Sequence, residues 1–290
     1  MQYYYFITGL PNLGLDDSKL TYTPTEFLAD AKLHLSQTDY RLMELLHIPA
    51  EVTHLLSLWY PEQARPVGES LYPEGFYEEF QAYLKQKLDN PATRMPEQFA
   101  GLPDYFETLG LELTGAEELP SFARTDHKFM VEFYQQAWKN SNEFIRKWFR
   151  LNADIQNILI AISGRRHEHA YADYLIGESD LTEKLAKSQA SDFGLGKEYP
   201  VYEAIWRIYD QNNILYRERG YDVYRWKWIE DQNFFEYFSI DRILGYYCKL
   251  RILARWTTLD TEAGKSVFYE ALTGLENSFS FPEEYAIKSK

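Results

Sequence analysis

The sequence predicts an all-α protein, and three observations support that prediction. Residues 122–163 contain no glycine or proline. Apolar residues recur there at spacings of three, four and seven, the period of an amphipathic helix. A strand-like pattern is confined to residues 3–10. We therefore expect long amphipathic helices with at most a short N-terminal strand.

The N-terminal region begins with the aromatic and β-branched run 3–10, which Gly9 and Pro11 interrupt. A short strand or a docked N-terminal arm both fit this pattern. The sequence Thr23-Pro24-Thr25-Glu26 is a typical helix start, since Thr23 can cap, Pro24 fits the first helical position and Glu26 completes a capping box. That helix should run to about residue 35.

The remaining elements follow from breakers and apolar faces. Proline and glycine mark residues 61–75 as a loop, and residues 110–120 read as a second loop. We place a lobe boundary in that second loop, so that 1–120 is an N-terminal helical lobe and 121–290 holds the long helices, divisible near 190–198. In the first lobe the expected helical segments are 24–35, two short segments up to 60, 76–88 and 97–109. The next segment covers 122–163, with a break at 140–142 and an end at Gly164. Short helices up to 174 and over 180–187 follow, then 199–256 and 261–272, and a polar tail over 279–290.

Composition limits the functions open to the chain. There are 44 acidic and 30 basic residues, a net charge of −14, which repels phosphate backbones and disfavours nucleic acid as a partner. Aromatic residues make up 17% of the chain and 24 of them are tyrosines, which suit helix packing and also protein interfaces. We favour helix packing as their main role.

The single cysteine, the N-terminal sequence and the lengths of the apolar runs predict a cytoplasmic protein without a thiol-based site. The only cysteine, Cys248, lies in an apolar helical run, so we expect a buried, unreactive thiol. The N-terminus lacks a positive region and a long apolar segment, and no run approaches the roughly 18–20 apolar residues that span a bilayer.

No motif predicts a catalytic centre or a cofactor. Asp192-Phe193-Gly194 spells the kinase magnesium motif, but the glycine-rich loop, strand lysine and HRD loop are absent, so we interpret it as a turn. His167-Glu168-His169, with Asp173, forms a conceivable metal site, yet its spacing is not that of a metalloprotease and a solvated helix start is the preferred interpretation. An acid/base pair of carboxylates stays open as an alternative.

Polar residues within the long helix over 144–162 are the most informative ones. Asn152, Asp154 and Asn157 alternate with apolar residues. Asparagine is a poor helix former, so its presence inside a helix calls for an explanation. Asp154 and Asn157 share a face, so their side chains can bond each other. We expect a structural use, either a buried polar contact or capping of a neighbouring segment, rather than ligand binding.

The same segment carries a resemblance. The run LNADIQNILIA over residues 151–161, followed by Arg165-Arg166 and by YLIG over residues 174–177, resembles the C-subunit family of archaeal and vacuolar-type rotary ATPases, which forms the socket of the central stalk. The whole chain resembles a bacterial family encoded beside vacuolar-type ATPase subunits, through YYYFITGLPNL at 3–13, ASDFGL at 190–195 and ILARWTTLD at 252–260.

This resemblance implies a non-catalytic coupling protein without a cofactor. Members of the family are funnels of three helical lobes that link the central stalk to the membrane rotor ring during proton or sodium ion transport. The resemblance makes Asp154, Asn157, Arg165 and Arg166 candidate socket residues. It implies the other ATPase subunits as partners and a peripheral location at the cytoplasmic face of the inner membrane, held by protein contacts only. The alternatives are an unrelated helical adaptor and a helical metal or acid/base enzyme.

Overall fold

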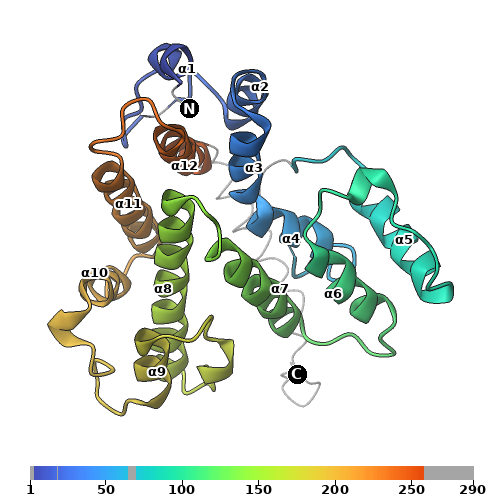
Figure 1. Ribbon diagram of the computed structural model, residues 1–290. Coiled ribbons are helices and arrows are strands. Elements are labelled where there is room, and N and C mark those ends of the chain that lie inside the picture. Colours follow the sequence, from blue (N-terminus) through green and yellow to red (C-terminus); the bar gives the residue numbers. More distant parts are fainter. Residues whose placement is uncertain (1–2, 18, 65–69, 258–290) are drawn as a thin grey trace, which may run out of the picture. The chain divides into compact units, whose positions relative to one another are not determined.

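The computed structural model describes residues 3–17, 19–64 and 70–257, and these ranges are helical with no strand (Figure 1). The all-α prediction is confirmed. The α-helices are α1 (Tyr4–Gly9), α2 (Pro24–His34), α3 (Gln37–Leu45), α4 (Ile48–Leu56), α5 (Phe76–Asp89), α6 (Asp104–Thr114), α7 (Phe122–Ala137), α8 (Glu143–Arg166), α9 (Asp180–Lys187), α10 (Pro200–Tyr209), α11 (Ile214–Gln232) and α12 (Ile240–Thr257). Three 3-10 helices cover Glu97–Phe99, Ala172–Tyr174 and Gly196–Glu198.

The chain forms two compact units. Residues 1–31 and 226–290 belong to one, here called the terminal unit, and residues 32–225 form the other, the middle unit. The boundary that we expected near residue 120 and the three-lobed funnel stay predictions. The helix expected over 261–272 and the tail over 279–290 lie outside the described residues.

Caps set several helix starts as the sequence indicates. In the predicted capping box, the Thr23 N–H donates to Glu26 Oε2 at 2.8 Å and the Glu26 N–H donates to Thr23 Oγ1 at 3.2 Å. Asn142 accepts from the Ile145 N–H at 2.8 Å and starts α8, which confirms the expected break at 140–142.

The N-terminal run differs from the expected extended segment. Residues 4–9 form a helical turn rather than a strand or arm. Phe6 is buried against Phe27 with ring centroids 5.5 Å apart, and the Tyr3 N–H donates to the Phe238 carbonyl at 2.8 Å. Tertiary contacts therefore override the strand preference of an aromatic run.

Two further boundaries were wrong because glycine does not end the helices concerned. Gly110 lies inside α6, where a Cβ would meet Leu84 Cδ1 at 2.6 Å, and Gly164 lies inside α8, where a Cβ would meet Tyr171 at 2.5 Å. In both places glycine allows a neighbouring segment to approach the helix closely. The expected helix over 97–109 is instead a 3-10 turn followed by α6, and the expected helix over 199–256 is interrupted at 210–213 and 233–239.

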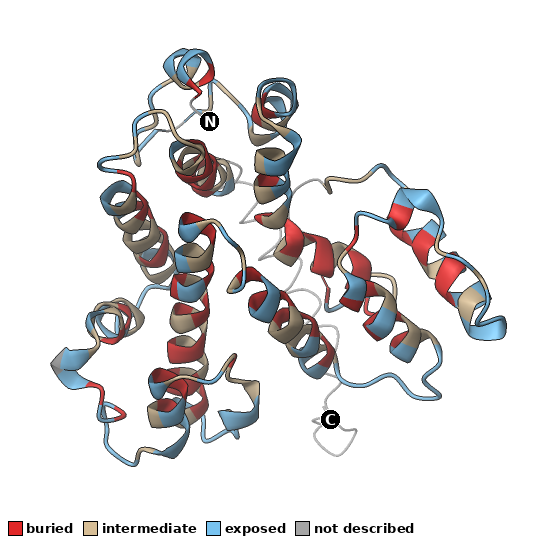
Figure 2. Cartoon of the chain, viewed as in Figure 1, coloured by how far each residue is buried: buried red, intermediate tan, exposed pale blue. Residues whose placement is uncertain are grey.

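The core of the middle unit is built on α8. Buried residues recur along its whole length (Figure 2), and it packs against α7, α9 and α10. Phe133 and Phe149 meet edge to face, with ring centroids 4.7 Å apart. Elsewhere in this unit α5 packs on α6 and α4 on α7. Helix α8 thus holds its polar residues among well-packed neighbours.

Candidate functional site

Asn157 has the structural role expected of a polar residue inside α8. Its side chain is buried, its Nδ2 donates to the Ile176 carbonyl at 2.9 Å, and its Oδ1 accepts from the Ile176 N–H at 2.7 Å. The side-chain amide thereby satisfies both backbone groups of Ile176, which precedes Gly177 in a turn. Gly177 has a φ of +80°. The expected structural use of Asn157 is confirmed as a buried polar contact, one of the two uses that the sequence left open.

Asn152 is also engaged inside the middle unit. It donates to the Trp148 carbonyl at 2.8 Å and accepts from Arg225 Nε at 2.9 Å. Arg225 in turn forms an ion pair with the buried Asp222 at 3.2 Å. The asparagine therefore connects α8 to α11 through a charged, mostly buried group.

Asp154 differs from its two neighbours. The expected bond to Asn157 is not formed, and the Asn157 amide binds the backbone of Ile176 instead. Among the described residues the Asp154 carboxylate forms no hydrogen bond or ion pair. Burial raises its pKa to about 6, against an opposing effect of the Arg150 charge.

Arg165 and Arg166 separate into an anchored and an exposed residue. Arg165 donates to the Ser188 carbonyl at 2.7 Å and to the Ala190 carbonyl, and its guanidinium lies 3.5 Å from the Phe193 ring centroid. Arg166 is exposed, with its guanidinium 5.7 Å from the Tyr209 ring centroid. The predicted socket residues thus do not form one surface, since Asn157 and Arg165 are both used to hold loops.

The Asp192-Phe193-Gly194 motif is a turn, as predicted. Phe193 is buried with φ +56°, an unusual value for a bulky residue, and Gly194 follows with φ +66°. Arg165 covers the Phe193 ring and binds the preceding carbonyls, so it stabilises this turn.

The remaining candidate ligands lie apart from any metal-binding geometry. His167 caps the C-terminus of α8 instead of starting a helix, and its ring centroid lies 6.3 Å from that of His169. Within the described ranges no group of three or more His, Cys, Asp or Glu residues is placed to hold a metal ion. Cys248 is buried as predicted, and burial raises the pKa of its thiol to about 12.

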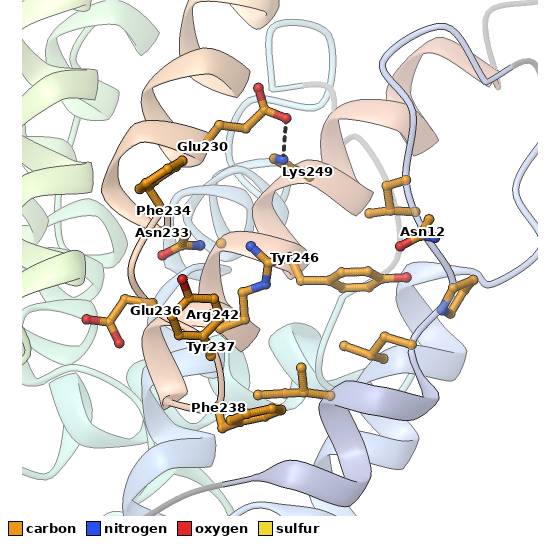
Figure 3. Close-up of a pocket in the computed structure, with 15 residues that line it drawn as sticks. Asn12, Glu230, Asn233, Phe234, Glu236, Tyr237, Phe238, Arg242, Tyr246 and Lys249 are labelled. Atoms are coloured by element: carbon orange, nitrogen blue, oxygen red, sulfur yellow. Dashed lines mark hydrogen bonds and ion pairs between the residues drawn. The ribbon is translucent and has the colours of Figure 1, made fainter.

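A pocket in the terminal unit is the feature that no sequence pattern predicted. Its volume is about 820 Å³, within the range of ligand-binding cavities. Figure 3 shows labelled side chains of α11, α12 and their connecting loop on one side and Asn12 of the N-terminal segment on the other. The Tyr246 ring extends across the pocket toward that segment. Apolar walls come from Ile7, Leu10, Pro11, Leu13 and Phe238.

Asn233 is a buried polar side chain in this pocket. It is 3% exposed, and its Oδ1 has no hydrogen-bond partner among the described residues. A Cβ on Gly245 of α12 would lie 1.8 Å from Asn233 Nδ2, so this glycine makes room for the amide. The Tyr246 hydroxyl is likewise buried, with no partner in the described part of the chain.

Two carboxylates, Glu230 and Glu236, and two cations, Arg242 and Lys249, line the pocket. Lys249 Nζ lies 2.9 Å from Glu230 Oε1, and Trp226 Nε1 donates to the same oxygen at 3.0 Å. Burial lowers the pKa of Lys249 and the Arg242 charge lowers it further, against the opposing effect of Glu230. Arg242 itself forms no ion pair or hydrogen bond with any described residue, so its guanidinium donors stay available.

Three exposed aromatic side chains lie in the loop between α11 and α12, and Phe234 and Tyr237 among them line the pocket. Phe234, Phe235 and Tyr237 are 68%, 79% and 65% exposed, and we call these three residues the aromatic rim. The helix expected over 199–256 would include Phe234 and Phe235, whereas both residues lie in the loop between α11 and α12. The run FFEYF at 234–238 was the available signal, because four aromatics in five residues exceed what one helix face can bury.

The fold and this site define an all-helical protein with a pocket beside exposed aromatic side chains. The chain belongs to the family described as "Protein of unknown function (DUF2764)", whose model matches residues 1–278. No curated protein and no solved structure matches the chain. No helix in the described ranges is both long and apolar enough to cross a membrane.

Proposed function

We propose that this protein is a non-catalytic coupling component of a vacuolar-type rotary ATPase, which links the central stalk to the membrane rotor ring. The resemblance in residues 151–177 is the reason for naming the rotary ATPase as the assembly. An exposed aromatic surface in the structure supports a role in binding other proteins. Coupling of proton or sodium ion transport is part of the same proposal.

The aromatic rim is the observation that carries the protein-binding role. Phe234, Phe235 and Tyr237 expose large apolar area beside a pocket, and clustered exposed aromatics mark protein interfaces. In the middle unit, the exposed residues Ile214, Leu215 and Tyr216 at the start of α11 offer a further apolar surface. Basic partner surfaces suit the net charge of −14.

The four candidate socket residues take different parts in this proposal. Asn157 and Arg165 bind backbone groups of turns. We therefore propose that they maintain the structure of the middle unit and do not contact a partner. Arg166 is exposed, and it is the one that we propose touches another ATPase component. Asp154 is partly buried with a pKa raised to about 6, and a basic group of a partner would lower that pKa by stabilising the carboxylate.

The location follows from the partners. We propose that the protein lies at the cytoplasmic face of the inner membrane and is held there by the ATPase subunits. Washing the membranes with high salt should then release it together with soluble stalk subunits, because charged interfaces between peripheral subunits are screened by salt.

Purification from native membranes tests the proposal. The chromosomal copy would carry an affinity tag, and membranes would be solubilised in mild detergent before capture. Stoichiometric recovery of stalk and ring subunits is the expected result, with a strain expressing the tag alone as control. Recovery of a different protein without ATPase subunits would instead identify an adaptor.

A functional measurement sharpens the same test. Inverted membrane vesicles from a strain that lacks the protein should hydrolyse ATP but transport few ions, because a coupling component passes on torque and performs no chemistry. Equal ion transport per ATP with and without the protein would contradict the coupling role.

A further inference from the structure

The first turn of α11 presents three consecutive apolar side chains to water. Ile214, Leu215 and Tyr216 are 69%, 53% and 64% exposed. Successive residues of an α-helix point about 100° apart, so these side chains surround the helix end and do not line one face. A groove that accepts one face of a helix binds residues three or four positions apart. The pattern at this end of α11 therefore suits insertion of the tip into an apolar layer.

Three backbone N–H groups of this turn already have acceptors. Asn213 Oδ1 accepts from the Leu215 N–H at 2.8 Å and from the Tyr216 N–H at 3.3 Å. The Arg217 N–H donates to the Asn213 carbonyl at 3.1 Å. An unpaired N–H is costly in an apolar layer, because no water is present there to bind it. Asn213 therefore lowers the cost of moving this helix end out of water.

Two arginines beside the tip form no ion pair with any described carboxylate. Arg217 belongs to the same turn, and its guanidinium lies 5.4 Å from the centroid of the Tyr209 ring. The exposed Arg166 of α8 approaches the same ring at 5.7 Å. Guanidinium groups bind phosphate oxygens through paired hydrogen bonds. Two unpaired arginines at one place, in a chain of net charge −14, indicate a surface suited to anionic groups.

This part of the chain does not share the negative charge of the whole. Residues 200–219 contain three acidic and three basic residues, and Arg166 adds a positive charge beside them. Glu203 is paired with Arg207. Charges farther away than about 8 Å are largely screened at physiological salt. The tip of α11 can therefore approach a surface that carries phosphates.

We propose that the first turn of α11 contacts the surface of a lipid bilayer. Ile214, Leu215 and Tyr216 enter the region between headgroups and acyl chains, where aliphatic side chains and the amphipathic tyrosine ring are favourable. Arg166 and Arg217 bind phosphates of the lipid headgroups. This contact is additional to the protein contacts of the proposed function and does not depend on them.

Flotation with lipid vesicles tests the contact directly. The full chain would be mixed with vesicles of phosphatidylcholine and phosphatidylglycerol at physiological salt, and bound protein would be separated on a density gradient. We expect a bound fraction that rises with lipid concentration. Protein that stays at the bottom of the gradient at every lipid concentration would overturn the proposal.

Substitutions locate the contact. Leu215→Glu should weaken vesicle binding by about 10-fold or more, because burial of a leucine is lost. Leu88→Glu changes a leucine of similar exposure, 48% against 53%, in the same unit and should have no effect. Arg166→Glu should weaken binding by about fivefold or more, with Arg94→Glu, at another exposed arginine, as its control. Thermal unfolding checks that each variant is folded. Equal effects of a variant and its control would refute this location.

A fluorescent probe reports insertion of the tip. Leu215→Cys can be labelled selectively with an environment-sensitive dye, because Cys248 is buried. Vesicles that contain nitroxide-labelled lipids should quench this dye. The same dye on Ala92→Cys, in the exposed loop after α5, should keep its fluorescence. Absence of quenching at position 215 would contradict insertion.

The same variant separates a lipid contact from a protein contact. If Leu215→Glu binds vesicles like the wild type but no longer recovers ATPase subunits from membranes, the turn binds protein and the lipid contact is refuted. If the wild-type protein binds vesicles as described but recovers no ATPase subunits, the lipid contact stands and the coupling role falls.

Discussion

Helix α8 and the pocket of the terminal unit each contain an asparagine and an arginine, yet the two regions engage these side chains differently. In α8, Asn157 and Arg165 bind backbone groups of loops that lie 19 to 25 residues away in the sequence. In the pocket, Asn233 Oδ1 and the Arg242 guanidinium have no partner among the described residues. Satisfied groups stabilise the fold, whereas unsatisfied groups retain capacity for a ligand.

Residues of the same chemical types therefore differ in whether the fold uses their hydrogen-bonding groups. An asparagine and an arginine occur in each region, so residue type alone does not separate the roles. The contrast predicts that substitutions in α8 lower stability and that substitution of an unpaired pocket residue leaves it nearly unchanged. The effects on stability should therefore be largest in α8 and smallest in the pocket.

The largest effect should come from Asn157→Ala. This change leaves the N–H and the carbonyl of Ile176 without their partner inside the protein, which should lower the free energy of unfolding by about 2–4 kcal/mol. Urea unfolding followed by circular dichroism measures it. Asn152→Ala, which removes half-buried bonds, is the matched control and should cost less. If both variants lost the same free energy of unfolding, the bonds of Asn157 to Ile176 would be no more important to stability than those of Asn152.

Arg165→Ala should have the next largest effect, about 1–3 kcal/mol, because two carbonyl contacts and the contact with the Phe193 ring are lost together. Arg166→Ala is the matched control. It removes an exposed side chain and should change stability by less than about 0.5 kcal/mol. Thermal unfolding of the two variants side by side gives the comparison, and a reversed order would contradict the anchoring role.

Asp154→Asn should stabilise the protein at neutral pH. Burial raises the carboxyl pKa to about 6, above its ordinary value of 3.8, so the folded protein binds more protons than the unfolded chain between these values. Stability is therefore lost as pH rises through about 6, and ionisation costs on the order of 1–2 kcal/mol at pH 7.5 after allowance for partial exposure. The variant should lose this pH dependence.

Unfolding measured at pH 4 and at pH 7.5 checks the sign. Wild type and Asp154→Asn should be alike at the lower pH and differ at the higher one. A variant that is less stable than wild type at pH 7.5 would mean that the Asp154 carboxylate has a favourable partner in the free protein.

Arg242→Ala should have the smallest effect on stability, within about 0.5 kcal/mol, because this exposed residue pairs with no described group. Thermal unfolding measures it, with Lys249→Met, which breaks the ion pair to Glu230, as a pocket variant expected to cost more. A large loss with Arg242→Ala would place this residue with the structural group of α8 and would weaken the contrast between the two regions.

The sequence by itself determined the helical class and much of the helix order. The periodicity of residues 122–163 and the caps at Thr23 and Asn142 act through neighbouring residues, so local patterns were sufficient. The structural use of Asn157 was also predictable, because a buried amide inside a helix requires a partner.

Only the tertiary structure decided the rest, because those features depend on segments that are far apart in sequence. Gly110 and Gly164 read as helix ends but are contact points for Leu84 and Tyr171. The run 4–9 became helical by packing on Phe27 and Phe238. The pocket combines residues near position 10 with residues near position 240, and no local pattern records that proximity.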